Sequence, residues 1–209
     1  MRRLSLVAGT ALLVLAWVGL LLDDGGSFTG RMLAHLGVVA LAAPLIAIGI
    51  AGTRWDISGC GRLLSPLPAS LVELLVVWVW HAPALRAAAA GSTWVTAAEQ
   101  ASFLLAGLLL WFACFGAGGG RSDARRAQGA FALLLTSIHM TLLGVLLALT
   151  PRPLYATGEV SCLGFAMTAQ RDQELGGVLM LLVGAAVYLA GGIALLGRLL
   201  AAPAAAGRS

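Results

Sequence analysis

Six apolar segments separated by short polar connections are the main feature of the chain. Each segment holds about 20 mainly apolar residues, the length that an α-helix needs to cross the hydrocarbon core of a bilayer. The segments are 4–22, 31–52, 66–82, 94–116, 130–150 and 174–197. The pattern therefore predicts an all-α integral membrane protein, in which a bundle of six transmembrane helices forms a single domain over residues 1–209.

The composition leaves little room for a soluble domain. Hydrophobic residues make up 60% of the chain and charged residues 11%, whereas a soluble domain has roughly 25% charged residues. The formal net charge of +4 comes from arginines in the short connections, where they set membrane topology and do not indicate a nucleic acid partner. We therefore expect most of the protein surface to contact membrane lipid.

The first apolar segment has some features of a signal peptide, because Arg2 and Arg3 precede it. Its 19 residues, 4–22, exceed the apolar region of about 7–15 residues that signal peptides carry, and no small-residue cleavage motif follows. We therefore expect a retained first helix.

The distribution of arginines predicts the orientation. With the N-terminus in the cytoplasm, nine arginines lie on the cytoplasmic side and four on the outer side. Basic residues favour cytoplasmic connections, so both termini are expected in the cytoplasm of a bacterial inner (plasma) membrane protein with several passes. The longest connection, 151–173, then lies outside.

Five ionisable residues interrupt the apolar segments, and they include every histidine: His35, Glu73, His81, Glu99 and His139. A charged or strongly polar side chain in hydrocarbon costs several kcal/mol unless it is paired. At 1.5 Å per residue, His35 and Glu99 lie roughly 6 and 8 Å below the outer interface. His81 lies at the same end of its segment, and His139 lies near mid-membrane. Asp172 and Gln173 stand at the outer mouth of the sixth segment.

Methionines accompany two of the histidines. Met32 precedes His35 by three residues, which places both on one helical face, and Met140 follows His139 directly. Imidazole and thioether together suit a soft or borderline cation, copper above all. The candidate metal ligands are His35, His81, His139, Met32, Glu99 and Asp172.

Simpler interpretations remain open for each residue. A lone histidine within a membrane helix is often a hydrogen-bonded packing residue, and Glu73 could form a hydrogen bond across helices. Cys60, Cys114 and Cys162 are scattered, with no CxxC spacing, so neither a disulfide framework nor a thiolate metal site is indicated. Neither GxSxG nor HExxH occurs, so we do not expect an enzyme.

Five stretches, in this order and spacing, resemble the CtaG family of cytochrome c oxidase assembly proteins, of the kind associated with caa-type oxidases. They are "RMLAHLGVVALAAPLIAIG" (31–49), "WHAPAL" (80–85), "EQASFLLAGLLLWF" (99–112), "HMTLLGVLLALTPRPLY" (139–155) and "DQELGGVLM" (172–180). The resemblance implies a membrane protein required for assembling haem–copper oxidase. Such a protein would help to supply copper, and its partners would be an oxidase subunit and a periplasmic copper donor. The family motif positions are occupied here by His35, His81, Glu99, Asp172 and Gln173.

Two departures from the family pattern bear on copper. The family usually has an H-x-x-x-H pair where this chain has Arg31 and His35, and it tends to place a histidine where this chain has Gln100. Both changes remove potential ligands, and Arg31 adds a positive charge that opposes binding of a cation.

Two alternatives to a copper protein therefore stay open. The first is a metal-free scaffold that stabilises an oxidase subunit during assembly, in which Arg31 pairs with Glu99 or Asp172. The second is a haem-binding membrane protein with His35 and His81 as axial ligands.

Overall fold

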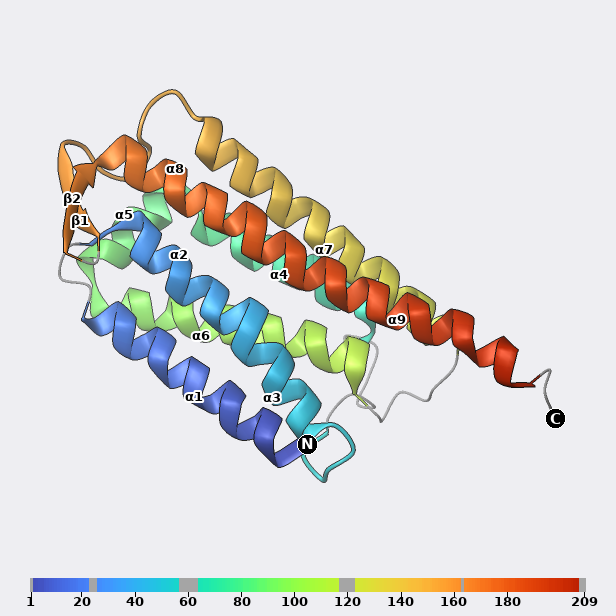
Figure 1. Cartoon of the computed structure of the whole chain (residues 1–209). Coiled ribbons are helices and arrows are strands. Elements are labelled where there is room, and N and C mark those ends of the chain that lie inside the picture. The colour runs from blue at the N-terminus through green and yellow to red at the C-terminus, as the bar shows by residue number, and fades with distance from the viewer. Residues whose placement is uncertain (1, 23–25, 57–63, 117–122, 163, 207–209) are drawn as a thin grey trace.

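The computed structural model describes residues 2–22, 26–56, 64–116, 123–162 and 164–206, and within them the chain forms an elongated helical bundle (Figure 1). The first predicted segment is α1, Arg2–Leu21. The second is one long helix in three parts: α2 (Phe28–Leu36), the π-helical η1 (Gly37–Ala42) and α3 (Ala43–Ile50). An all-α membrane protein is thereby confirmed, because five helices are long and apolar enough to cross a bilayer.

The third predicted segment, 66–82, is a bent pair of helices. Helix α4 covers Pro66–Trp80 and α5 covers Pro83–Gly91, and the two meet at an angle of 71°. The sequence predicted a polar connection where α5 lies. Pro83 accounts for the bend, since proline disfavours a helical conformation at the preceding residue while it suits the first turn of a new helix. If this pair counts as one span, the described part of the chain has six.

The remaining spans agree with the prediction within a few residues at most ends. Helix α6 covers Thr93–Phe115 and α7 covers Asp123–Leu149. The last span begins earlier than predicted and is again interrupted by a π-helical segment: α8 (Ala169–Leu179), η3 (Met180–Gly184) and α9 (Ala185–Ala206). Helix α7 approaches α8 and η3 closely. A Cβ on Gly144 would lie 2.8 Å from the carbonyl oxygen of Gly177 in α8 and 2.7 Å from the backbone nitrogen of Leu181 in η3.

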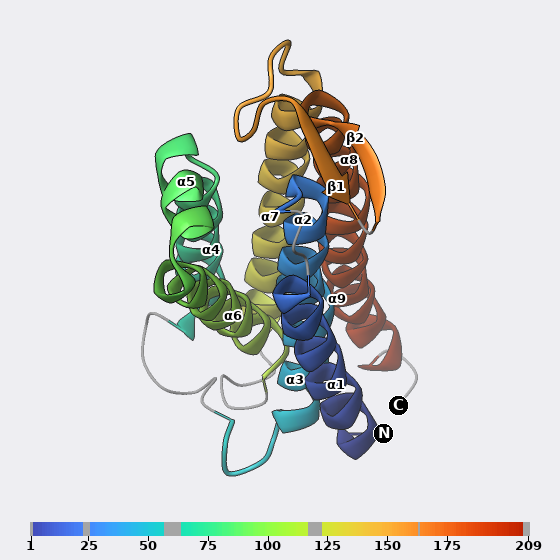
Figure 2. The same ribbon diagram turned by 90° about the vertical axis from the view of Figure 1, so that its left-hand side faces the viewer.

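The connection 151–173 is partly structured. It contains a hairpin of two antiparallel strands, β1 (Glu159–Cys162) and β2 (Phe165–Thr168), followed by the first residues of α8. Thr168 caps α8, its side chain accepting a hydrogen bond from the backbone N–H of Arg171. The hairpin lies at the same end of the bundle as α5 and the start of α2 (Figure 2).

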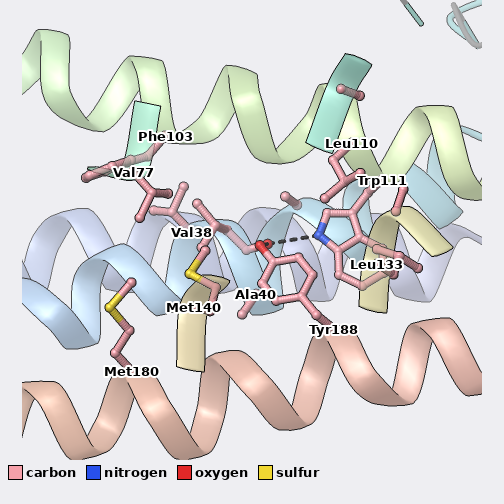
Figure 3. Close-up of a cluster of buried hydrophobic side chains, with 14 of the residues drawn as sticks. Val38, Ala40, Val77, Phe103, Leu110, Trp111, Leu133, Met140, Met180 and Tyr188 are labelled. Atoms are coloured by element: carbon pink, nitrogen blue, oxygen red, sulfur yellow. Dashed lines mark hydrogen bonds between the residues drawn. The ribbon is translucent and has the colours of Figure 1, made fainter. Parts of the chain in front are cut away.

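The core gathers around η1. A π-helical turn leaves a backbone carbonyl free of its usual α-helical partner, and here the carbonyl of Val39 accepts a hydrogen bond from Trp111 Nε1 at 3.0 Å (Figure 3). Tyr188 stacks on Trp111, and its hydroxyl donates to Glu73 of α4. The expected hydrogen bond of Glu73 across helices is thereby confirmed.

Candidate metal and polar site

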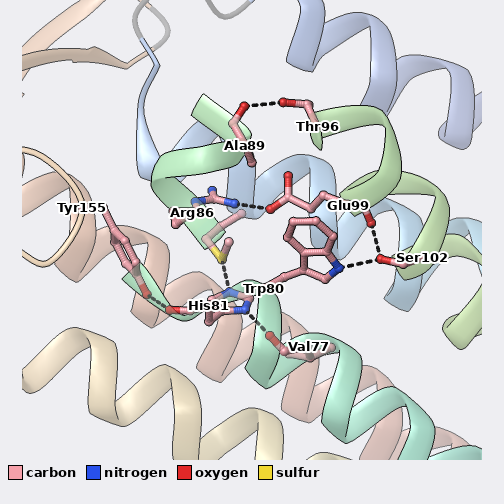
Figure 4. Close-up of polar contacts among 10 residues, drawn as sticks. Val77, Trp80, His81, Arg86, Ala89, Thr96, Glu99, Ser102 and Tyr155 are labelled. Atoms are coloured by element: carbon pink, nitrogen blue, oxygen red, sulfur yellow. Dashed lines mark hydrogen bonds and ion pairs between the residues drawn. The ribbon is translucent and has the colours of Figure 1, made fainter. Parts of the chain in front are cut away.

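Helix α2 and the bend between α4 and α5 bring three of the six candidate ligands together. The Sδ atom of Met32 lies 3.4 Å from Nε2 of His81, a contact drawn in Figure 4. The ring centroids of His35 and His81 are 5.6 Å apart. Met32 and His35 are fully buried, and His81 is 5% exposed. Of the expected cluster of Met32, His35, His81 and Glu99, the first three therefore lie together, with Met32 and His35 on α2 and His81 at the end of α4.

The hydrogen bonding of His81 fixes which ring nitrogen can accept a cation. His81 caps the C-terminus of α4, and its Nδ1 lies 2.7 Å from the carbonyl oxygen of Val77. A carbonyl can only accept, so Nδ1 carries the proton. In the neutral imidazole, the lone pair of Nε2 then points toward the Met32 thioether. Histidine metal ligands in proteins use the same arrangement, with the second nitrogen anchored to a carbonyl or carboxylate.

His35 has no hydrogen-bond partner for either ring nitrogen within the described residues. Its ring instead packs against Phe103, with centroids 4.1 Å apart. Buried polar atoms are nearly always hydrogen-bonded in native proteins. Two unsatisfied nitrogens beside another histidine and a thioether therefore point to a ligand.

Glu99 has a partner that the sequence did not predict. Its Oε1 accepts a hydrogen bond from Arg86 Nη1 at 2.6 Å, and both side chains are almost completely buried (Figure 4). The guanidinium of Arg86 also lies over the ring of Phe28, 5.4 Å from its centroid. The distribution of arginines predicts Arg86 in an outer connection. In the structure α5 turns its side chain inward, where it contacts Glu99.

Asp172 is committed to the backbone of α2. Its carboxylate oxygens accept hydrogen bonds from the N–H groups of Phe28 at 2.6 Å and Thr29 at 3.0 Å. This carboxylate therefore satisfies two of the donors that every helix leaves unpaired at its N-terminus, where negative charge is favourable. Gln173 anchors the loop that follows α7, because its side chain accepts a hydrogen bond from the N–H of Leu154 and donates one to the carbonyl oxygen of Leu147.

Arg31 does not pair with Glu99 or Asp172, contrary to the scaffold alternative. Its Nη1 is buried and has no hydrogen-bond partner in the described part of the chain. Arg31, Arg86 and Asp172 line a cavity of about 50 Å³ at this end of the bundle. Arg31 therefore forms no ion pair among the described residues, although the carboxylate of Asp172 lines the same cavity.

An aromatic pair separates this cavity from the histidines. Phe28 stacks on Tyr155 with centroids 4.7 Å apart, and the edge of Phe28 faces His81. The hydroxyl of Tyr155 donates to the carbonyl oxygen of His81 at 2.8 Å. Burial raises the pKa of Tyr155 to about 12, although the nearby charge of Arg86 acts in the opposite direction. The phenol therefore stays protonated and keeps donating at physiological pH.

His139 lies apart from this cluster. It is buried in α7, and neither of its ring nitrogens has a hydrogen-bond partner in the described chain. No hydrogen bond or ring contact recorded for the described residues joins it to His35 or His81. Within the same residues, no group of three or more His, Cys, Asp or Glu side chains is arranged to hold a metal ion. Met32 is therefore the further candidate ligand beside His35 and His81.

Comparison with known proteins identifies the family. The model of the cytochrome c oxidase caa3 assembly factor family (Caa3_CtaG) matches residues 1–202 of the 209. Searches of curated proteins and of solved structures each returned no match. Because the match spans nearly the whole chain, and because the resembling stretches supply the buried cluster of Met32, His35 and His81, the protein belongs to the Caa3_CtaG family of cytochrome c oxidase assembly factors.

Proposed function

We propose that this protein assists the assembly of cytochrome c oxidase by holding copper, as cargo, between Met32, His35 and His81. The family supports the oxidase as the destination. The contact between Met32 Sδ and His81 Nε2 is the observation that carries the assignment of the ligands. With Nδ1 of His81 donating to Val77, this contact brings two lone pairs together without a proton between them.

The distance between these two atoms fits a shared cation. A nitrogen ligand at about 2.0 Å and a sulfur ligand at about 2.3 Å, at the tetrahedral angle, lie about 3.5 Å apart. The observed separation is 3.4 Å. Two imidazoles on one ion, each centroid about 3.2 Å from it, are separated by about 5.2–5.5 Å for angles between tetrahedral and trigonal. The centroids of His35 and His81 lie 5.6 Å apart.

The ligand set suits transient storage of Cu(I). Thioether and imidazole are ligands that copper accepts, and the soft thioether favours the cuprous state. A site with two imidazoles and one thioether, and with Glu99 and Asp172 engaged elsewhere, holds the ion through few bonds. Few bonds allow release to an oxidase subunit. Arg31 and Arg86 line the neighbouring cavity, so we propose delivery by a periplasmic copper donor protein in preference to uptake of free ions.

The proposal includes a membrane arrangement. The bent pair α4–α5 is the third of six spans in a single domain, the termini lie in the cytoplasm of the bacterial inner membrane, and the cluster faces outward. The protein does not turn over a substrate in this scheme. His139 and Met140 form a second, deeper copper station in α7.

A metal-free scaffold is the second candidate, and the structural contacts of the two carboxylates favour it. Glu99 and Asp172 both have structural roles, bound to Arg86 and to the N-terminus of α2. Haem fits less well than either alternative. The Sδ atom of Met32 lies 3.4 Å from His81 Nε2, on the side where a haem iron would have to bind.

Copper titration of the purified protein tests the proposal. We expect one high-affinity Cu(I) per protein at Met32, His35 and His81 and a second, weaker one at His139 and Met140. Both are measured under reducing conditions against a chromogenic chelator in mild detergent. His35→Ala, His81→Ala and Met32→Leu should each weaken binding at the first site at least tenfold. Met140→Leu is the matched control for Met32→Leu because both methionines are fully buried, and it should leave the first site unchanged.

The outcome is read together with thermal unfolding of each variant, so that a folding defect is recognised. Unchanged copper binding in folded His35→Ala and His81→Ala proteins contradicts the proposed site. Absence of copper from the unmodified protein supports the scaffold instead. Loss of copper binding in His139→Ala alone would show that the site lies in α7 instead.

A further inference from the structure

A groove between α1 and α6 plays no part in the copper proposal. Its apolar part has a volume of about 240 Å³ and is lined by Trp17, Ala97 and Gln100, among others. It continues into a more polar hollow of about 290 Å³ that includes Arg31 and Thr93. The two parts share residues of both helices, Leu20, Leu21, Thr93 and Thr96, and therefore form one continuous depression.

Two buried donors along this depression lack acceptors within the described chain. They are Nη1 of Arg31 in the polar part and Nε1 of Trp17 in the apolar part. Nη2 of Arg86, in the adjoining cavity that Arg31 also lines, is unpaired as well. Buried donors without partners are costly, so each indicates an acceptor supplied from outside the chain.

The charged side chains around the depression indicate the charge of the ligand that it would bind. Arg86 is neutralised by Glu99, and Asp172 is held by two backbone N–H groups of α2. Arg31 forms no ion pair among the described residues and its Nη1 has no acceptor, whereas the carboxylate of Asp172 is turned toward the N-terminus of α2. The polar end of the depression therefore suits a ligand with anionic, hydrogen-bond-accepting oxygens, while its apolar part suits hydrocarbon.

We propose that this depression binds one anionic phospholipid. The phosphate accepts hydrogen bonds from Arg31, an acyl chain lies between α1 and α6, and an ester carbonyl accepts from Trp17 Nε1. The order of these groups matches a lipid, because Trp17 lies about 6 Å below the end of α1 at 1.5 Å per residue. Arg31, which opposes copper, thus serves an anion, and this inference does not depend on copper binding.

Lipid binding to the delipidated protein tests the headgroup contact. Native mass spectrometry in detergent would give dissociation constants for dioctanoyl phosphatidylglycerol and dioctanoyl phosphatidylcholine. We expect phosphatidylglycerol, whose headgroup has a net negative charge, to bind at least tenfold more tightly than the zwitterionic phosphatidylcholine. Arg31→Gln should weaken both lipids, because both carry the phosphate, and should weaken phosphatidylglycerol at least fivefold more than phosphatidylcholine. Arg171→Gln removes an exposed arginine from the same end of the bundle and should change neither constant.

A second pair of variants tests the acyl chain. Ala97→Phe fills the groove from α6 and should weaken both lipids at least fivefold. Ala98→Phe places the same side chain at the next exposed position of α6, outside the residues that line the groove, and should change binding less than twofold. Equal affinity of the unmodified protein for both lipids overturns the proposal. So does displacement of phosphatidylglycerol by inorganic phosphate together with no effect of Ala97→Phe, because a free anion would then be the ligand.

Discussion

The buried ion pair between Arg86 and Glu99 makes a quantitative prediction about stability. Its atoms are 2.6 Å apart, and the side chains are 6% and 0% exposed. With charge centres about 4 Å apart and an effective dielectric constant of about 20, their attraction is about 4 kcal/mol. Removing one partner leaves an uncompensated buried charge, which costs about 3–5 kcal/mol. We therefore expect Glu99→Gln and Arg86→Gln each to lower the free energy of unfolding by about that amount.

A double-mutant cycle isolates the pair from the other contacts of Arg86, such as its position over Phe28. The double variant should be at least about 2 kcal/mol more stable than the sum of the single losses implies. Denaturant unfolding in mixed micelles measures all four free energies. A coupling energy below about 0.5 kcal/mol, the range of exposed pairs, refutes the reasoning. Folded Glu99→Gln should still bind copper normally, since the carboxylate belongs to Arg86.

Three further predictions concern other described contacts. Asp172→Asn should lower the free energy of unfolding by about 1–2 kcal/mol, because a neutral amide caps α2 less well than a carboxylate; denaturant unfolding measures this, and copper affinity should not change. Gly144→Ala should destabilise by about 1–3 kcal/mol through a clash with the α8–η3 backbone, whereas Gly197→Ala, which has open space around it, should be neutral in the same assay. The pKa of Tyr155 rises from 10.0 to about 12 on folding, so the folded protein holds more protons in that window and stability should fall as pH rises through it; in Tyr155→Phe this part of the decline should be absent from the pH profile.

Much of the fold follows from the pattern of apolar residues. Four of the six segments, 4–22, 31–52, 66–82 and 94–116, match helices of the structure within three residues at both ends. Apolar segments of about 20 residues have few alternatives to crossing a bilayer. The last two spans are longer than predicted. The bend at Pro83 was missed because α5 is rich in alanine and carries Arg86, a composition that loops share. The π-helical segments were not predictable, because they depend on partners such as Trp111 and Tyr188 from other helices.

The sequence predicted how deep the site residues lie in the membrane, but not the directions in which their side chains point. Counting residues from a helix end gave a common level for His35, His81 and Glu99, yet it does not fix the rotation of each helix about its axis. Rotation decides that Met32 faces His81 while Glu99 faces Arg86. A signal for Arg86 was present, since Pro83 at the start of a helix places the residue three positions later one turn away.

The short α4 has a consequence for the surrounding bilayer. Its 15 residues extend about 22 Å, whereas the hydrocarbon core is about 30 Å thick. Hydrophobic mismatch of this size is relieved by local thinning of the membrane or by sorting into thinner regions. His81 lies at the end of α4, where such thinning would act. A patch of thinned bilayer there would shorten the path between the buried thioether–imidazole cluster and any protein docking from the aqueous side.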